Sequence, residues 1–174
     1  MARVPLLDAE DVPEEYRYLF TENDVGDADI FRGMANNPKL LQWYLRYASR
    51  LWETLPERER EILILAAARA LDHEYEWHQH VTLGREVGLS DDEIVAISRN
   101  DLDGFDDHEA ALAAYGRSLA LFDIRDTDHE RLREHYDDET VVGVAMLGSH
   151  YLATAATLDA MGVEPEGEFV GWEL

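Results

Sequence analysis

The sequence of 174 residues contains no cysteine. A disulfide framework, a thiolate metal site and thiol redox chemistry are therefore excluded. Long apolar runs are also missing: no segment approaches the roughly 18 uninterrupted apolar residues that a membrane span needs. The first ten residues include acidic residues and lack the apolar core of a signal peptide. We therefore expect a cytoplasmic protein with no membrane partner.

Basic residues are scarce. Lys39 is the single lysine, and 15 basic residues face 38 acidic ones, for a net charge of −23. Such a charge repels the phosphates of nucleic acids, so no nucleic-acid partner is expected. The excess acid could serve to bind cations. Because the acids are spread along the whole chain, we favour a surface adapted to a salt-rich, halophilic cytoplasm.

Linkers, repeats and strand signals are absent or nearly so, whereas signals for helix starts and stops are frequent. Apolar residues make up 46% of the chain, enough for a sizeable core. We predict an all-α bundle and a single domain spanning residues 1–174. The predicted helices are 13–20, 30–35, 39–53, one ending near 71, 73–87, 91–97, 106–122 and 139–161, with a loop at 21–29 and an irregular tail at 164–174.

Local patterns refine these boundaries. The spacing of a capping box occurs at Thr54, Ser90 and Thr127, which predicts a helix start after each. Gly143 and Gly148 indicate close packing of the last helix against its neighbours. Trp43, Tyr44 and Tyr47 are expected in the core or in a subunit interface.

The helix that contains residues 62–68 is apolar on every side, which is typical of a central, buried helix. Glu61 stands at the start of this run, so its carboxylate is expected to be buried. Burial of a carboxylate is costly unless the group is paired or protonated, and such groups tend to have a raised pKa. Glu61 is therefore a candidate functional residue.

The next helix carries His73, Glu76 and His80 at spacings of three and four, which places them on one face. This face could be a solvated polar stripe. It could also be a zinc or iron site, with Glu61 as a fourth ligand. His78 points away and is expected to be solvated, and His150 is expected to be a core histidine bonded to a backbone carbonyl.

Three segments, 55–61, 74–81 and 88–94, resemble the carboxymuconolactone decarboxylase family, which includes the alkylhydroperoxidase D-like proteins. Residues 29–32 with Asn37-Pro38, and the final helix up to Val163, are similar to the same family, so the resemblance covers nearly the whole chain. It implies a helical bundle of the alkylhydroperoxidase D-like type. It also implies a homo-oligomer, a trimer or a trimer of dimers.

The peroxidase branch of that family has a glutamate, a Cys-x-x-Cys pair and a histidine. Carried over by position, the glutamate falls on Glu61, the two cysteines on His73 and Glu76, and the histidine on His80. Both thiols are therefore missing. Because peroxide reduction in that branch needs them, thiol peroxidase activity is not expected.

The decarboxylase branch lacks the cysteines and keeps a glutamate four residues before the histidine, as Glu76 and His80 are placed here. This resemblance implies a lyase, without a cofactor, that transfers protons on a small organic acid or lactone. His80 would be the main proton donor or acceptor, Glu76 would orient it, and Glu61 would tune the pocket. A non-catalytic, ligand-binding scaffold and a His/Glu metal-dependent enzyme remain as alternatives.

Geometry adds one further expectation. A break near Leu71-Asp72 should fold the two helices into an antiparallel hairpin. Glu61, Glu76 and His80 should then converge on one enclosed pocket.

Overall fold

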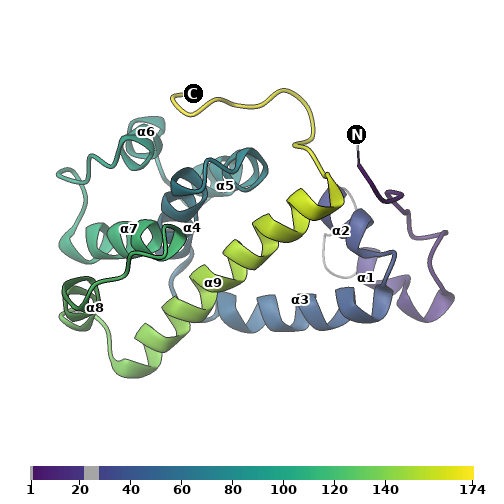
Figure 1. Cartoon of the computed structure of the whole chain (residues 1–174), viewed down its shortest axis with the longest axis horizontal. Helices are drawn as coiled ribbons and strands as arrows, with labels where there is room; N and C mark the ends of the chain where they lie inside the picture. Colours follow the sequence, from purple (N-terminus) through teal and green to yellow (C-terminus); the bar gives the residue numbers. More distant parts are fainter. Residues whose placement is uncertain (1, 22–27) are drawn as a thin grey trace.

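The computed structural model describes residues 2–21 and 28–174, and in this part of the chain every regular element is helical (Figure 1). The all-α prediction is therefore confirmed. Most of the predicted loop 21–29 lies outside the described residues. The elements are η1 (Glu14–Tyr16), α1 (Tyr18–Thr21), α2 (Asp29–Met34), α3 (Pro38–Trp52), α4 (Glu57–Ala70), α5 (Glu74–Glu86), α6 (Asp91–Arg99), α7 (Asp107–Ala120), α8 (Asp126–Arg133) and α9 (Asp138–Met161).

Helix α4 is the centre of the molecule. All of its residues from Glu61 to Ala68 are buried, and α5, α6, α7 and α9 pack around it. Helix α7 packs closely against α4, because a Cβ atom on Gly116 would come within 2.6 Å of the Leu63 carbonyl oxygen. The apolar surface on every side of α4 is thus matched by a neighbour on every side, as the sequence predicted.

Helix α9 crosses the molecule diagonally and touches both α3 and the α4–α7 pair (Figure 1). Gly143 and Gly148 allow this close packing, because a Cβ atom would meet Thr54 at 2.5 Å and Leu119 at 2.3 Å. By length and composition α9 is one helix that could cross a membrane, and half of its most apolar stretch is buried. Its contacts with α3, α4 and α7 give it the place of a core helix.

Two of the three predicted capping boxes are wrong. Ser90 forms one, with its side chain accepting from the Glu93 N–H and the Glu93 carboxylate accepting in return. Thr54 does not, because the extended backbone of Pro56 (ψ 148°) delays the start of α4 to Glu57. Thr127 lies inside α8, whose N-cap is Arg125. The predicted first helix, 13–20, is divided into η1 and α1.

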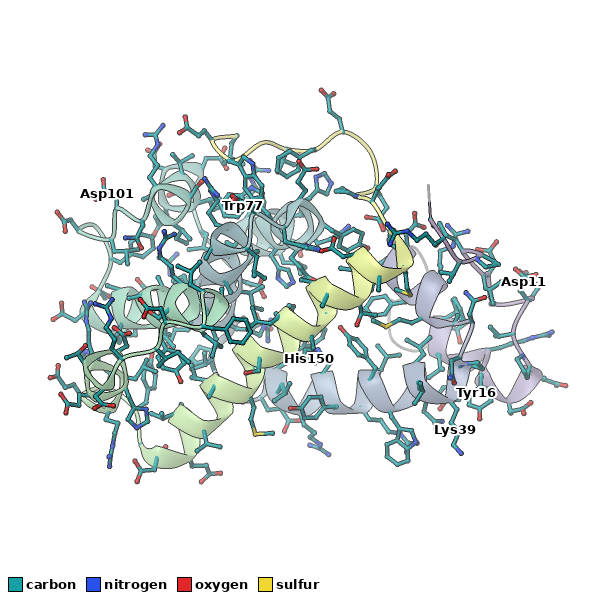
Figure 2. All side chains as sticks on the ribbon, viewed as in Figure 1. Asp11, Tyr16, Lys39, Trp77, Asp101 and His150 are labelled. Carbon is teal, nitrogen blue, oxygen red and sulfur yellow. The ribbon has the colours of Figure 1, made fainter. Side chains whose placement is uncertain are left out.

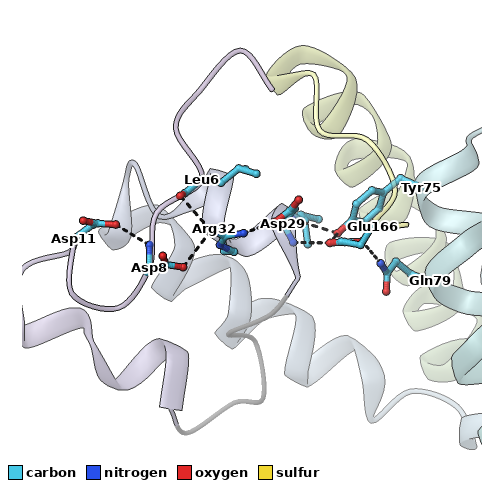
Figure 3. Close-up of polar contacts among 9 residues, drawn as sticks. Leu6, Asp8, Asp11, Asp29, Arg32, Tyr75, Gln79 and Glu166 are labelled. Atoms are coloured by element: carbon cyan, nitrogen blue, oxygen red, sulfur yellow. Dashed lines mark hydrogen bonds and ion pairs between the residues drawn. The ribbon is translucent and has the colours of Figure 1, made fainter. Parts of the chain in front are cut away.

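Residues 164–174 form an irregular strap over α5. Glu166 holds it in place by accepting hydrogen bonds from the Asp29 backbone N–H, the Tyr75 hydroxyl and the Gln79 amide (Figure 3). Farther along, Trp77 donates from Nε1 to the Gly171 carbonyl at 2.8 Å. The strap therefore covers the outer face of the helix that carries His80.

His78 also lies under this strap. Its Nδ1 accepts from the Val170 N–H at 3.3 Å, and its ring lies beside Phe169. The expectation of a solvated His78 is therefore wrong, because the C-terminal segment covers the face to which it points.

Candidate functional site

The α4–α5 hairpin positions the candidate residues. Helix α4 ends at Ala70 with Leu71 as its C-cap, Asp72 takes a left-handed conformation (φ 51°), and His73 is the N-cap of α5. This tight turn reverses the chain within three residues. The start of α4 and the later part of α5 therefore lie together, as predicted, and Glu61 meets His80.

Glu61 and His80 form a direct, buried contact. Oε2 of Glu61 lies 2.6 Å from Nδ1 of His80, and the two residues are 1% and 6% exposed. On its other oxygen, Glu61 accepts from Nε of Arg60 at 3.2 Å. The imidazole is thereby oriented through Nδ1, which leaves Nε2 as the atom that can exchange a proton with other groups.

Glu76 lies on that other side of the ring. Its Oε2 is 3.6 Å from Nε2 of His80, one helical turn away on α5. Its Oε1 is buried and has no hydrogen-bond partner among the described residues. A buried carboxyl oxygen without a donor favours the protonated form of the group.

The three groups differ in their protonation. Burial raises the pKa of Glu76 to about 7, and the positive charge of His80 only partly offsets this. Burial also opposes the charged form of Glu61, but His80 and Arg60 outweigh it, so that the pKa of Glu61 is lowered. Burial likewise acts against a charged His80, yet the two carboxylates raise its pKa overall. The site therefore holds an ion pair beside a carboxyl group that gains or loses its proton near neutrality.

Tyr151 of α9 closes the site from above the imidazole. Its ring packs edge-on against His80 with the centroids 4.9 Å apart. The Tyr151 hydroxyl accepts from Nε1 of Trp52 at 3.1 Å, and burial keeps its pKa well above the usual value. A neutral tyrosine fixed by Trp52 thus shields the ion pair from water.

A narrow recess leads to Glu76 from the outside, and it has no room for a water-sized molecule. Apart from Glu76 and Tyr151, its lining is aliphatic: Ile64, Ala67, Ala68, Leu71 and Leu152. Ligand sites for small molecules usually enclose about 300 Å³ or more, so this recess would have to open before it could admit a substrate. Leu71 is 37% exposed, so one wall of the recess faces the solvent. Of the three candidates, only Glu76 lines the recess. Glu61 and His80 do meet, but the expectation that all three converge on one enclosed pocket is wrong for the described residues, because the side chains around them fill the space.

The structure also corrects the expected arrangement in two respects. Glu61, rather than Glu76, makes the close bond that orients His80. His73 does not join the cluster: it caps α5 by accepting from the Glu76 N–H, and its Nε2 faces Asp159 at 3.6 Å. The described residues contain no group of three His, Asp or Glu side chains arranged to hold a metal ion, so His73, Glu76 and His80 do not form the alternative metal site.

His150 occupies a second aromatic cluster, between α9 and α3 (Figure 2). Tyr44, Tyr47 and Tyr151 surround its ring, with centroid distances of 4.8, 5.5 and 5.4 Å. In the described part of the chain no backbone carbonyl accepts from it, contrary to expectation. Burial lowers the pKa of His150 to about 4, so the ring is neutral.

Sequence reasoning missed three residues of the site: Arg60, Trp52 and Tyr151. Arg60 directly precedes Glu61, and this adjacency was a usable signal. Trp52 and Tyr151 come from α3 and α9, and nothing in the local sequence places them beside His80.

Known proteins are similar to this chain in both sequence and structure. The sequence profile of the carboxymuconolactone decarboxylase family matches residues 38–116, a region that includes Glu61, Glu76 and His80. A search of curated proteins finds no match.

Solved structures give the same result for the fold. An uncharacterized peroxidase-related protein from Ralstonia eutropha, with an alkylhydroperoxidase AhpD core, is 18% identical and superimposes with a TM-score of 0.78 over 99% of this chain and 97% of the other. An uncharacterized peroxidase-related protein from Silicibacter is 16% identical and superimposes with a TM-score of 0.79 over 99% of this chain and 96% of its own. The third structure is a cysteine-to-alanine variant of the debrominase Bmp8 in complex with 2,3,4-tribromopyrrole. It is 14% identical to this chain and superimposes with a TM-score of 0.81 over 94% of this chain and 91% of its own.

At these identities the structural likeness concerns the fold alone, while the sequence profile covers the hairpin that holds the site. The chain therefore has an alkylhydroperoxidase D-like fold, contains no cysteine, and matches the carboxymuconolactone decarboxylase family over residues 38–116.

Proposed function

We propose that this protein catalyses proton transfer on a small, largely apolar carbonyl compound such as an unsaturated lactone. The observation that carries the proposal is Glu76: a buried carboxyl with a pKa of about 7 and an unpartnered oxygen, in contact with an aliphatic recess. A group whose pKa matches the working pH is well suited to give and take protons.

The proposed step uses the three residues in order. The carboxylate form of Glu76 removes a proton from a carbon next to the lactone carbonyl, and the C–H electron pair moves into the enolate. Neutral Glu76 then gives a proton to a carbon of that enolate, and the new C–H bond consumes the electron pair. Between the two transfers, Glu76 can exchange its proton with Nε2 of His80. Glu61 holds His80 by Nδ1 and stabilises the imidazolium, so His80 acts as the reservoir and Glu61 as the positioning residue.

Decarboxylation of a lactone acid is a narrower form of the same proposal. There the C–C bond to the carboxylate breaks, CO₂ leaves, and the electron pair remains on the ring until Glu76 protonates it. A substrate carboxylate needs a cation, and no arginine or lysine lines the recess. Arg60, the nearest cation to the site, is engaged with Glu61. A neutral lactone therefore suits the described lining better than its acid.

Deuterium exchange tests the proposal without a known physiological substrate. Unsaturated γ-lactones, with and without a carboxyl group, are incubated with the protein in D₂O, and incorporation at carbon is followed by NMR. We expect the wild type to accelerate exchange in a neutral lactone, and both Glu76→Gln and His80→Gln to abolish the acceleration. His150→Phe is the matched control, because it replaces a buried histidine outside the site and should retain exchange. Exchange that survives Glu76→Gln would refute the assignment.

A second candidate is a scaffold without catalysis, favoured by the closed recess. In that case neither lactone binding, measured by calorimetry, nor exchange would occur in any variant.

A further inference from the structure

The recess beside Glu76 is closed, so a substrate can reach this carboxyl only after one wall of the recess has moved. Helix α4 cannot supply the movement, because its residues from Glu61 to Ala68 are all buried. The strap holds the outer face of α5 through Glu166 and Gly171. Helix α9 is packed against α3, α4 and α7. Three walls built of helices are therefore fixed.

The remaining wall is the turn between α4 and α5. Leu71 lines the recess and is 37% exposed. Asp72 follows in a left-handed conformation, and its side chain is 76% exposed and pairs with Arg69 one turn earlier. These two residues of the turn have little contact with the core. The turn is therefore the wall whose movement costs the least free energy.

His73, the next residue of the turn, is the part that is tied down. Its side chain is 11% exposed and touches two helices. Nδ1 accepts a hydrogen bond from the backbone N–H of Glu76 at 3.3 Å and thereby caps α5. Nε2 lies 3.6 Å from Oδ1 of Asp159 on α9, and the ring also interacts with the backbone of Ala155 on the same helix.

This contact stands at the edge of the recess. In the sequence, His73 lies between Leu71 and Glu76, which both line the recess. On α9, Ala155 follows the lining residue Leu152 by about one helical turn. The ring of His73 thus joins the turn to α9 beside the place where these two walls must separate.

We propose that neutral His73 is the latch of the recess: it holds the turn against α9, and its release opens the way to Glu76. This inference rests on the proposed function only in that the recess is the route by which a substrate reaches Glu76.

A proton on the ring releases the latch. An imidazolium carries hydrogen on both nitrogens, so Nδ1 can no longer accept from the Glu76 N–H. Its positive charge also lies beside the positive end of the α5 dipole, which repels it. The cap and the tether are therefore both weakened by one protonation.

The groups around His73 set the pH of this release. Burial is the largest influence on the pKa of His73 and lowers it below the ordinary 6.5. Asp159 and the Ala155 backbone on α9, and Glu74 on α5, act in the opposite direction without reversing the shift. Asp72, in the turn itself, is engaged with Arg69. The latch is therefore closed at neutral pH and opens in mild acid.

Thiol labelling measures the opening, because the chain has no cysteine of its own. Ala67→Cys places a thiol in the wall of the recess, at a residue that is 1% exposed. Ala113→Cys on α7 is the matched control, since it is 2% exposed and lies away from the recess. Phe122→Cys, at 85% exposure, gives the rate of an exposed thiol at each pH. The small reagent methyl methanethiosulfonate is applied to all three.

Two substitutions at His73 separate the latch from the helix cap. Asn is a good N-cap that replaces the Nδ1 side of the ring but lacks the Nε2 side, so His73→Asn keeps the cap and loses the contact with α9, whereas His73→Ala loses both. Relative to position 113, each should label position 67 about tenfold faster than the unsubstituted His73, as expected for one lost interaction that opposes a local opening. If His73→Asn labels like the unsubstituted protein, His73 is only a cap and the inference fails.

The pH dependence tests the neutral form of the latch. With rates scaled to Phe122→Cys, labelling at position 67 is compared at about pH 7.5 and about pH 5. The protein with His73 should gain at least about twofold over His73→Asn, which reports the titration of every other group. Equal pH dependence of the two proteins would overturn the inference.

Labelling needs no turnover, so the latch and the proposed chemistry can fail separately. Labelling that responds to His73→Asn, without lactone exchange in any variant, supports the latch and refutes the proton-transfer function. Lactone exchange by the wild type, together with labelling that ignores His73→Asn, refutes the latch alone.

Discussion

The molecule buries two histidines against the same tyrosine, and they behave in opposite ways. His80 and His150 are 6% and 8% exposed, and both rings pack against Tyr151. The pKa of His80 is raised, whereas that of His150 is lowered to about 4. Burial opposes the charged form of both. The difference comes from Glu61 and Glu76, which face His80 and have no counterpart beside His150 among the described residues.

This comparison separates burial from function. A buried histidine among tyrosines is an uncharged packing residue. The same histidine between two carboxylates becomes a charged group that can exchange protons near neutral pH. The following changes test whether the carboxylates alone account for the difference.

The largest effect is expected for Glu61→Leu. It leaves the imidazole of His80 buried without its partner at 2.6 Å, and breaking such a pair typically costs about 3–5 kcal/mol. The pKa of His80 should move below its ordinary value, as that of His150 has done. Urea unfolding at pH 7 and NMR titration of the imidazole measure the two effects. A pKa of His80 that stays raised would show that Glu61 is not its cause.

His150→Phe should act in the acid range. Because the folded-state pKa of about 4 lies below the ordinary 6.5, the unfolded chain binds a proton that the folded chain does not, and stability falls as the pH drops from 6.5 to 4. The full loss is about 3 kcal/mol. The variant should lack this loss and differ from the wild type by less than about 1.5 kcal/mol at pH 8. Equal acid sensitivity of the two proteins would contradict a neutral His150.

Glu76→Gln should stabilise the protein at alkaline pH. Glu76 has a pKa raised to about 7, so between pH 4.5 and 7 the folded chain holds a proton that the unfolded chain has lost, and stability falls as the pH rises. Gln carries no such penalty. We expect the variant to be more stable by about 1–3 kcal/mol at pH 8 and equal to the wild type near pH 4.5. Thermal unfolding across this range tests the sign.

Glu76 and His150 therefore give the wild type opposite slopes of stability against pH over much of the same range. Their effects partly cancel. Substitution of one residue should therefore leave the pH dependence of stability that the other residue causes. A double variant, Glu76→Gln with His150→Phe, should remove both of these contributions.

Tyr151→Phe should have the smallest effect. It removes the hydroxyl that accepts from Trp52 but keeps the ring against both histidines, which costs about 1 kcal/mol. The shifts of the His80 and His150 pKa values should keep their directions. A reversal of either would mean that the hydroxyl, rather than the carboxylates, controls the pair.

Much of the site follows from the sequence for one physical reason. The run after Glu61 has no polar side, which places Glu61 in the core, and the turn at Asp72 forces α5 back against α4. These are local patterns, and they predict the meeting of Glu61 and His80. Which carboxylate bonds to Nδ1 depends on side-chain rotamers and on the fit between helices, so the roles of Glu61 and Glu76 were exchanged.

The remaining errors have the same origin in tertiary structure. The environment of His78 is determined by residues more than 90 positions away, in the strap. Tyr151 reaches His80 from a helix that begins more than 50 residues later. His73 was predicted within the helix, but the left-handed Asp72 delays the helix start by one residue and turns its ring into a cap.

The strap also sets an order of events during synthesis. Residues 169–172 contribute to the cover of the fully buried Trp77, and these residues leave the ribosome after everything they cover. Until then, the outer face of α5 displays a bare indole next to the helix turn that holds His80. The nascent chain can therefore form the hairpin early, but the helix that carries the histidine gains its cover last.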